Sequence, residues 1–247
     1  MGLIESEGIV LRSYNLAEAD KIVVCLTRHA GVVRTVARGA RRLKSRFGAG
    51  LEPFTIIALT YYEKEGRELV SLRQAEIIRS FFGLASSTEA VAALAYMSEL
   101  VMEFAPPHEP NERLFRMVRA VVETLDSTPG DLTALLRYFE VWTLRLAGFL
   151  PDLRVCAECA KRLGDDSPVY FNAELKARCG QCSNRLGREF SQAAYKQLRS
   201  AQRLSPSEFA ASVRNISTEP LNELADLSQG LIGRILERQP RSRANLN

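Results

Sequence analysis

Two pairs of cysteines are the residues whose types and spacing point most directly to chemistry. Cys156 and Cys159 form one C-x-x-C pair, Cys179 and Cys182 form the second, and 19 residues separate the pairs. This spacing is typical of zinc ribbons and knuckles, because one tight turn delivers two sulfurs to a tetrahedral ion. Four sulfur ligands leave no position for water or substrate, so the pattern predicts one structural zinc ion per chain. The alternative is four reduced cysteines without a metal.

A dense run of cations is the second feature. Six cations and no acid occupy the thirteen residues 34–46, and they are Arg34, Arg38, Arg41, Arg42, Lys44 and Arg46. Charge of one sign repels itself and favours an anionic partner, so the run is interpreted as a DNA phosphate-binding loop. Arg12 and Lys21, on neighbouring predicted strands, are further candidate DNA contacts. The alternative is a solvated loop without a ligand.

The charge balance and nearby aromatic residues belong to the same third of the chain. Residues 1–80 carry 13 Lys and Arg against 9 Asp and Glu, whereas residues 81–247 carry 20 of each. The whole net charge of +4 therefore falls in the first 80 residues. Five aromatic residues could stack on unpaired bases, although most are expected in the core: Tyr14, Phe47, Phe54, Tyr61 and Tyr62.

The elements that would position these groups change type along the chain. Residues 7–14, 20–28, 31–38, 53–62 and 68–78 are rich in Val, Ile, Leu, Thr and Tyr and predict five strands. Five strands with one long loop after the third suit a small closed barrel such as the OB-fold, although an SH3-like barrel would have a similar pattern. The predicted N-terminal domain is residues 1–80.

Residues 81–247 are predicted to form an α-helical domain. Helices are expected at 90–104, 112–126 and 132–147, with further helices opened by Ser191 and by the Ser205–Glu208 capping box, and a last one from about 220 to 238. Ser86, Asn111 and Asp131 are the expected caps of the first three, and the tail after Pro240 is expected to fray. The zinc module is an insert at about 151–190. The fold class is therefore multidomain α+β.

Several function classes lack support in the sequence. There are two histidines, His29 and His108, and no G-x-S-x-G, H-E-x-x-H or G-x-G-x-x-G motif, so we expect no enzyme. No apolar run is long enough for a membrane span, and the acidic N-terminus is no secretory signal, so we expect a cytoplasmic location. The odd cysteine count argues against a disulfide framework, and Cys25, in the apolar run 22–26, is expected to be a small buried hydrophobe.

Several segments resemble the RecO family in order and spacing. The similar segments are residues 8–12, 17–23, 26–31, 37–46, 53–54, 136–140 and 146–149, with the cysteine pairs following directly. The resemblance spans residues 4 to about 190 and includes the zinc-containing members. Ala160 departs from the pattern, because a Gly is expected after the first cysteine pair.

The resemblance implies an OB-fold, a helical domain with an embedded zinc module, and a role in bacterial recombinational repair. It implies binding of single- and double-stranded DNA, annealing of complementary strands and, with RecR, loading of RecA onto DNA coated by single-strand-binding protein. It also implies docking of that protein's C-terminal tail on the helical domain, RecF as a possible further partner, and a location at the nucleoid. The rival classes are a zinc-ribbon RNA- or ribosome-associated binding protein, a divalent-cation hydrolase and a pure interaction scaffold.

Overall fold

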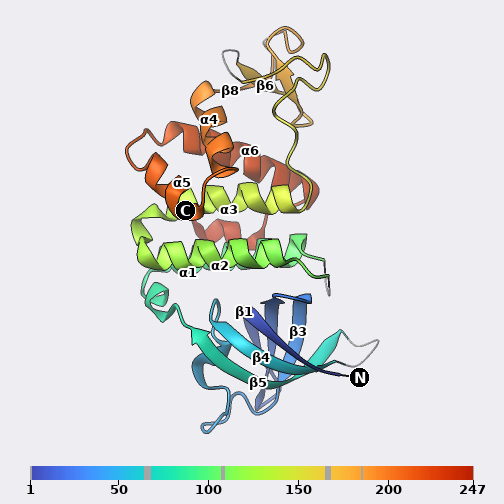
Figure 1. Ribbon diagram of the computed structural model, residues 1–247, viewed down its shortest axis with the longest axis vertical. Helices are drawn as coiled ribbons and strands as arrows, with labels where there is room; N and C mark the ends of the chain where they lie inside the picture. The colour runs from blue at the N-terminus through green and yellow to red at the C-terminus, as the bar shows by residue number, and fades with distance from the viewer. Residues whose placement is uncertain (1, 64–67, 107–108, 165–167, 185, 247) are drawn as a thin grey trace. The chain divides into compact units, whose positions relative to one another are not determined.

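The computed structural model describes residues 2–63, 68–106, 109–164, 168–184 and 186–246. It divides into two compact units (Figure 1). Unit 1 comprises residues 1–127 together with 241–247, and unit 2 comprises residues 128–240. Unit 1 thus joins the predicted barrel to the first two helices, and the domain boundary expected between residues 80 and 81 stays a prediction.

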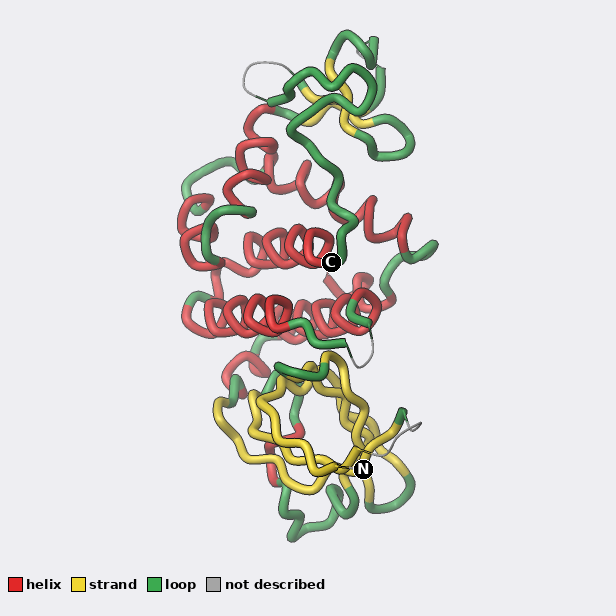
Figure 2. Tube along the Cα trace, turned by 45° about the vertical axis from the view of Figure 1, so that its right-hand side comes forward, coloured by secondary structure: helices red, strands yellow, loops and turns green. Residues whose placement is uncertain are grey.

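Five strands form the barrel of unit 1, and their number and order along the chain are as predicted. They are β1 (Gly2–Leu16), β2 (Asp20–Thr27), β3 (Gly31–Ala37), β4 (Ile56–Glu63) and β5 (Leu69–Arg79). Hydrogen-bonded neighbours follow the closed order β1-β2-β3-β5-β4, with β4 paired to β1, and the strands appear as a ring in Figure 2. Among these neighbouring strands, β3 and β5 run parallel to each other, and the other pairs are antiparallel.

Strand β1 is long because it serves two neighbours. Its first half pairs with β4 and its second half with β2, and the register shifts between Val10 and Arg12. Such a bulge bends a strand and increases its twist, which closure of a small barrel requires. Of the six candidate cations of residues 34–46, Arg34 lies in β3 and the other five lie between β3 and β4.

The interior of the barrel is filled by alternate residues of the strands. Val23 and Cys25 of β2, Val33 of β3 and Tyr61 of β4 are all at most 1% exposed. Burial raises the pKa of the Cys25 thiol to about 12, so this side chain stays neutral. The prediction that Cys25 is a buried small hydrophobe is confirmed.

Helices α1 (Thr88–Phe104) and α2 (Glu112–Ser127) also belong to unit 1. The cap of α1 is Ser87, whose hydroxyl accepts from the backbone N–H of Ala90, so the expectation of Ser86 was wrong by one residue. Asn111 caps α2 as predicted, through Leu114. The hydroxyl of Ser98 donates to the carbonyl of Leu11 over 2.8 Å, which fastens α1 to β1.

The C-terminal segment belongs to unit 1 and is ordered. It forms the 3-10 helix η4 (Arg241–Leu246), in which Ser242 is buried. The buried carboxylate of Glu99 in α1 accepts from the backbone N–H of Arg241 over 2.9 Å and of Ser242 over 2.8 Å. The expectation of a frayed tail was wrong. The carboxylate of Glu99, which is distant in sequence, accepts the hydrogen bonds of tail N–H groups that have no acceptor close in sequence.

The described residues of unit 2 form four α-helices, a short 3-10 helix (Pro129–Asp131) and a small sheet. The helices are α3 (Leu132–Leu146), α4 (Gln192–Ala201), α5 (Pro206–Val213) and α6 (Glu219–Ile235). Strands β6 (Val169–Phe171), β7 (Ala177–Cys179) and β8 (Arg188–Phe190) pair in the order β7-β6-β8 within the predicted insert. The capping hydroxyl of Ser191 and the capping box of Ser205 and Glu208 are confirmed.

The remaining predicted cap has another role. Asp131 precedes α3, but its side chain makes no capping hydrogen bond to the described residues. Its two oxygens accept from Nε and Nη2 of Arg214 over 2.9 and 2.6 Å.

None of the described helices is both long and apolar enough to cross a bilayer.

Candidate metal centre and nucleic-acid interface

The four paired cysteines converge at one point in unit 2. Their Sγ atoms all lie within 4.8 Å of one another, and Sγ of Cys159 is 3.8 Å from Sγ of Cys179. Two sulfurs bound to zinc at about 2.3 Å in a tetrahedron are about 3.8 Å apart, so the cluster has the dimensions of a four-thiolate site. A metal ion could therefore be held here by cysteine alone.

Local backbone hydrogen bonds shape both cysteine turns. The backbone N–H of Ala160 donates to the carbonyl of Cys156 over 3.0 Å, and that of Cys182 donates to Sγ of Cys179 over 3.4 Å. Ala160 adopts φ 57°, a left-handed conformation that favours Gly. This is the position at which the family resemblance predicts Gly. After the second pair, Asn184 has a positive φ of 50°.

The pKa values of Cys156 and Cys182 shift in opposite directions. Burial opposes ionisation of Cys156, but backbone N–H groups, first that of Cys159, outweigh it and lower the pKa of this thiol to about 6. The neighbouring thiols, first Cys159, raise the pKa of Cys182. Four thiolates cannot crowd together without a compensating positive charge, and a divalent cation would provide it.

The chain around the cysteine cluster is hydrogen-bonded to Tyr195 of α4. Its buried hydroxyl lies 3.1 Å from the carbonyl oxygen of Leu153 and 3.4 Å from that of Leu163. A Cβ placed on Gly164, where φ is 102°, would lie 2.1 Å from the Tyr195 ring. The chain that follows the first cysteine pair can therefore pack this closely against α4 only with a glycine at position 164.

The candidate DNA-binding cations lie on unit 1 in two groups. The six of residues 34–46 are all exposed. Four of them make no side-chain hydrogen bond or ion pair to the described residues, and these are Arg34, Arg38, Arg42 and Lys44. Arg41 donates to the carbonyl of Ala17 over 2.9 Å, and Arg46 lies 4.9 Å from the centre of the Phe47 ring.

Arg12 and Lys21 are less available than the loop cations. Both are half-buried, Lys21 lies 3.6 Å from Glu52 in an ion pair, and Arg12 donates to the hydroxyl of Tyr14 over 3.3 Å. Their role in DNA binding stays a prediction.

A groove on the barrel adds a cation that the sequence did not single out. A cavity of about 610 Å3 is lined by three arginines, one acid and one tyrosine, among others, and these are Arg38, Arg46, Arg73, Glu68 and Tyr62. The guanidinium of Arg73 lies 5.7 Å from the centre of the Tyr62 ring. Arg73 was missed because it lies outside the contiguous cationic run, and the signal is its exposed position in β5 next to buried Leu72.

The aromatic candidates divide as expected. Phe47, Phe54 and Tyr61 are at most 3% exposed, whereas Tyr14 and Tyr62 are 44% and 41% exposed. Three of the five thus belong to the core, and the two tyrosines remain available for stacking. His29 is exposed in the turn between β2 and β3, and His108 lies outside the described residues.

Comparison with known proteins decides the family. The model of the recombination protein O N-terminal domain matches residues 1–81, and that of its C-terminal domain matches residues 85–244. The chain belongs to the RecO family. A DNA repair protein RecO from Anaeromyxobacter dehalogenans strain 2CP-C is 38% identical over 184 residues, which cover 74% of this chain and 72% of the relative.

Other RecO relatives match nearly end to end. The RecO protein of Geobacter metallireducens is 34% identical over 91% of this chain and 96% of its own length, and that of Clostridium acetobutylicum is 29% identical over 100% and 98%. RecO membership indicates a DNA repair protein in recombination, and this family is not known as a family of enzymes. The predicted resemblance to RecO is confirmed.

Proposed function

We propose that this chain is a non-catalytic DNA-binding mediator of recombinational repair. It binds single- and double-stranded DNA, anneals complementary strands and, with RecR, helps load RecA onto DNA coated by single-strand-binding protein. The observation that carries the proposal is the exposed loop after β3, in which Arg38, Arg42 and Lys44 have no side-chain partner among the described residues. Cations held away from acids keep their full charge for phosphate.

The barrel supports the proposal by its topology. A closed five-stranded order in which β3 runs parallel to β5 is the arrangement that we assign to an OB-fold. OB-folds bind single strands in a basic groove that carries aromatic stacking surfaces. The groove with Arg38, Arg46 and Arg73 beside exposed Tyr62 has both components.

The physical mechanism is charge neutralisation. Each phosphate contact releases condensed counterions, so the affinity should fall as salt rises. A protein that neutralises two strands at once also lowers their mutual repulsion and so favours pairing. Phosphate contacts carry no base information, so binding should be largely independent of sequence.

We assign one structural zinc ion per chain to Cys156, Cys159, Cys179 and Cys182. The ion would supply a fixed link between two chain segments, and four sulfur ligands would leave it no open position for catalysis. The thiols themselves do the positioning, because β7 ends at Cys179 and the first pair is tied to α4 through Tyr195.

The protein partners are assigned by family. We place docking of the acidic C-terminal tail of single-strand-binding protein on the helical part of the chain, and RecF is a further candidate partner. A location at the nucleoid in the cytoplasm follows from DNA as the ligand.

A strand-annealing assay tests the proposed function. Complementary DNA strands are mixed with the protein, with and without single-strand-binding protein, and duplex formation is followed over time. Faster annealing in both conditions is expected. A protein that leaves DNA annealing unchanged but binds RNA tightly would overturn the proposal in favour of an RNA-binding protein.

A further inference from the structure

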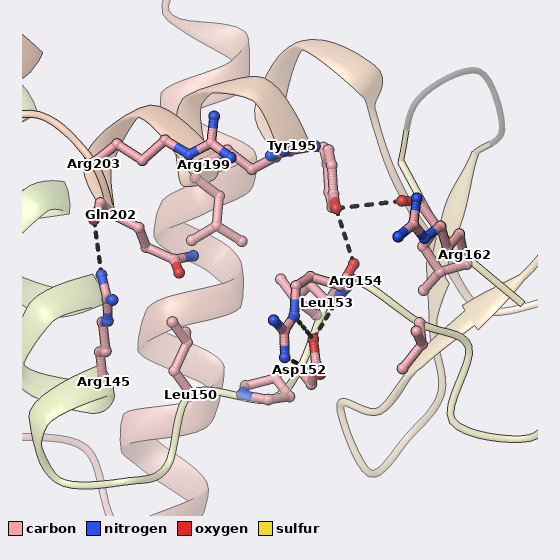
Figure 3. A pocket seen from close by; sticks show the side chains of 14 residues that line it. Arg145, Leu150, Asp152, Leu153, Arg154, Arg162, Tyr195, Arg199, Gln202 and Arg203 are labelled. Atoms are coloured by element: carbon pink, nitrogen blue, oxygen red, sulfur yellow. Dashed lines mark hydrogen bonds and ion pairs between the residues drawn. The ribbon is translucent and has the colours of Figure 1, made fainter. Parts of the chain in front are cut away.

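A pocket in unit 2 carries five arginines that the proposed function does not use. A cavity of about 820 Å3 lies between the end of α3, residues 150–163 and α4, and Figure 3 shows its side chains. Its cations are Arg145, Arg154, Arg162, Arg199 and Arg203, and its one acid is Asp152. The Asp152 carboxylate forms an ion pair with Arg154, with 2.9 Å between Oδ2 and Nη2. The pocket therefore has a large excess of positive charge, which favours an anionic ligand.

The arginines form a row along the pocket. Figure 3 shows Arg145 and Arg203 at one end, Arg162 at the other, and Arg199 between them. Arg162 and Arg203 are exposed and make no side-chain hydrogen bond or ion pair to the described residues. A row of donors suits a ligand with a repeating anion rather than one with a single charged end, and guanidinium groups bind phosphate through two parallel hydrogen bonds.

Flat apolar surfaces accompany these charges. The guanidinium of Arg145 lies 4.6 Å from the centre of the Trp142 ring, and that of Arg199 lies 5.9 Å from that of Tyr195. A guanidinium that stacks on a ring exposes its second face, on which a base can stack. Leu150, Leu153 and Leu198 add an apolar lining between the cations.

We propose that this arginine pocket binds the phosphates of one single strand of nucleic acid, as a second strand site in addition to the barrel loop. The proposal rests on the proposed function, in which annealing needs two strands on one protein. It assigns one strand to cations of unit 1 and the other to cations of unit 2.

Two of these arginines lie on the chain segments that flank the first cysteine pair. Val155 and Arg162 form an antiparallel bridge, and the backbone N–H of Leu163 donates to the carbonyl of Arg154 over 2.8 Å. Arg154 and Arg162 thus stand on the two chain segments that lead into and out of the Cys156–Cys159 turn. The cluster that orders the turn also orders one wall of the pocket.

The test measures how many strands the full-length protein binds. A fluorescent oligothymidylate of about eight nucleotides, a length within the range of one OB-fold site, is titrated at several salt concentrations. The parent is expected to bind two strands per chain. Arg162→Ala/Arg203→Ala should lose one strand at physiological salt. At low salt, where this strand still binds, the slope of its log affinity against log salt should be smaller by about 1.4, for two lost single-strand contacts. The matched control Lys161→Ala/Lys196→Ala removes two exposed cations beside the pocket and should keep both strands.

Two results would overturn this inference. One is a pocket variant that binds two strands with the parent's salt slope. The other is a pocket variant that keeps both strands but loses the acidic tail peptide of single-strand-binding protein, which would make the pocket a peptide site. The loop variant Arg41→Ala/Arg42→Ala/Lys44→Ala separates the two proposals, since it should lose the other strand. If it binds like the parent while the pocket variant loses a strand, the loop assignment fails and the pocket stands.

Discussion

The backbone N–H of Ala160 donates to the carbonyl oxygen of Cys156 over 3.0 Å, and the turn that this bond closes requires φ 57° at Ala160. A side chain with a Cβ is strained in this conformation by about 1 kcal/mol or more. Ala160→Gly should therefore stabilise unit 2 by roughly that amount, measured as a rise in the melting temperature. Ala157→Gly is the control, because Ala157 is exposed in the same turn without a positive φ. A stabilisation from Ala157→Gly equal to that from Ala160→Gly would contradict the strain argument.

The cysteine cluster predicts one zinc ion per chain. Elemental analysis of protein purified without chelator should give close to one equivalent, and Cys179→Ser should lower it and destabilise the segment 151–190, since coordination is coupled to folding. Cys25→Ser is the control for zinc content, because Cys25 lies in the barrel of unit 1. A metal content near zero in the parent, with four free thiols and an intact fold, would refute the assignment.

The pair of Asp131 and Arg214 predicts a pH dependence of stability. Hydrogen bonds from Arg214 hold the pKa of Asp131 below its ordinary value. A carboxyl whose folded pKa is lowered contributes stability fully above its unfolded pKa of about 3.9, and loses it as the pH falls through the folded pKa. Arg214→Met should thus lower the melting temperature slightly at neutral pH, because Arg214 is half exposed and solvent screens the pair. The difference between parent and variant should shrink below about pH 4, and a difference that stays constant to pH 2 would contradict this account.

The carboxylate of Glu99 predicts that the C-terminal segment stabilises unit 1. Glu99→Ala leaves the N–H groups of Arg241 and Ser242 without this acceptor, and an unsatisfied buried donor costs about 1 to 3 kcal/mol. Removal of residues 241–247 should destabilise the protein as well. Val91→Ala, a substitution at an exposed position of the same helix, is the control. Unchanged melting of both the Glu99 variant and the truncated protein would contradict the anchoring role.

Local patterns predicted much of the fold. The five strands, the caps Asn111 and Ser191 and the capping box at Ser205 depend on residues close in sequence, so the chain itself shows them. The four cysteines were also found from spacing, because each turn is local and only their convergence is not. Long-range partners were not predictable. Asp131 precedes α3 in the sequence in the same way whether its carboxylate caps that helix or binds Arg214.

The candidate DNA site shows the same limit. The cations of residues 34–46 form a contiguous run, whereas Arg73 joins them only because β5 lies parallel to β3. The arginine pocket of unit 2 is assembled from α3, α4 and the chain between residues 150 and 163, and no window of the sequence contains it. The presence of an aromatic residue in a strand did not predict whether its ring is exposed for stacking, because Tyr61 is buried and adjacent Tyr62 is exposed.

The measurement that tests the central claim most directly is the salt dependence of DNA binding and annealing by Arg41→Ala/Arg42→Ala/Lys44→Ala. If these exposed cations contact phosphates, binding should weaken about equally for every DNA sequence, and the slope of log affinity against log salt should fall by about 0.7 to 0.9 per lost contact. Annealing should decline in parallel, and the fold should survive, because exposed cations contribute little to stability. Arg113→Ala/Arg116→Ala, which removes exposed cations from α2, should leave DNA binding unchanged. A loop variant that melts, binds DNA and anneals like the parent, with the same salt slope, would contradict the account.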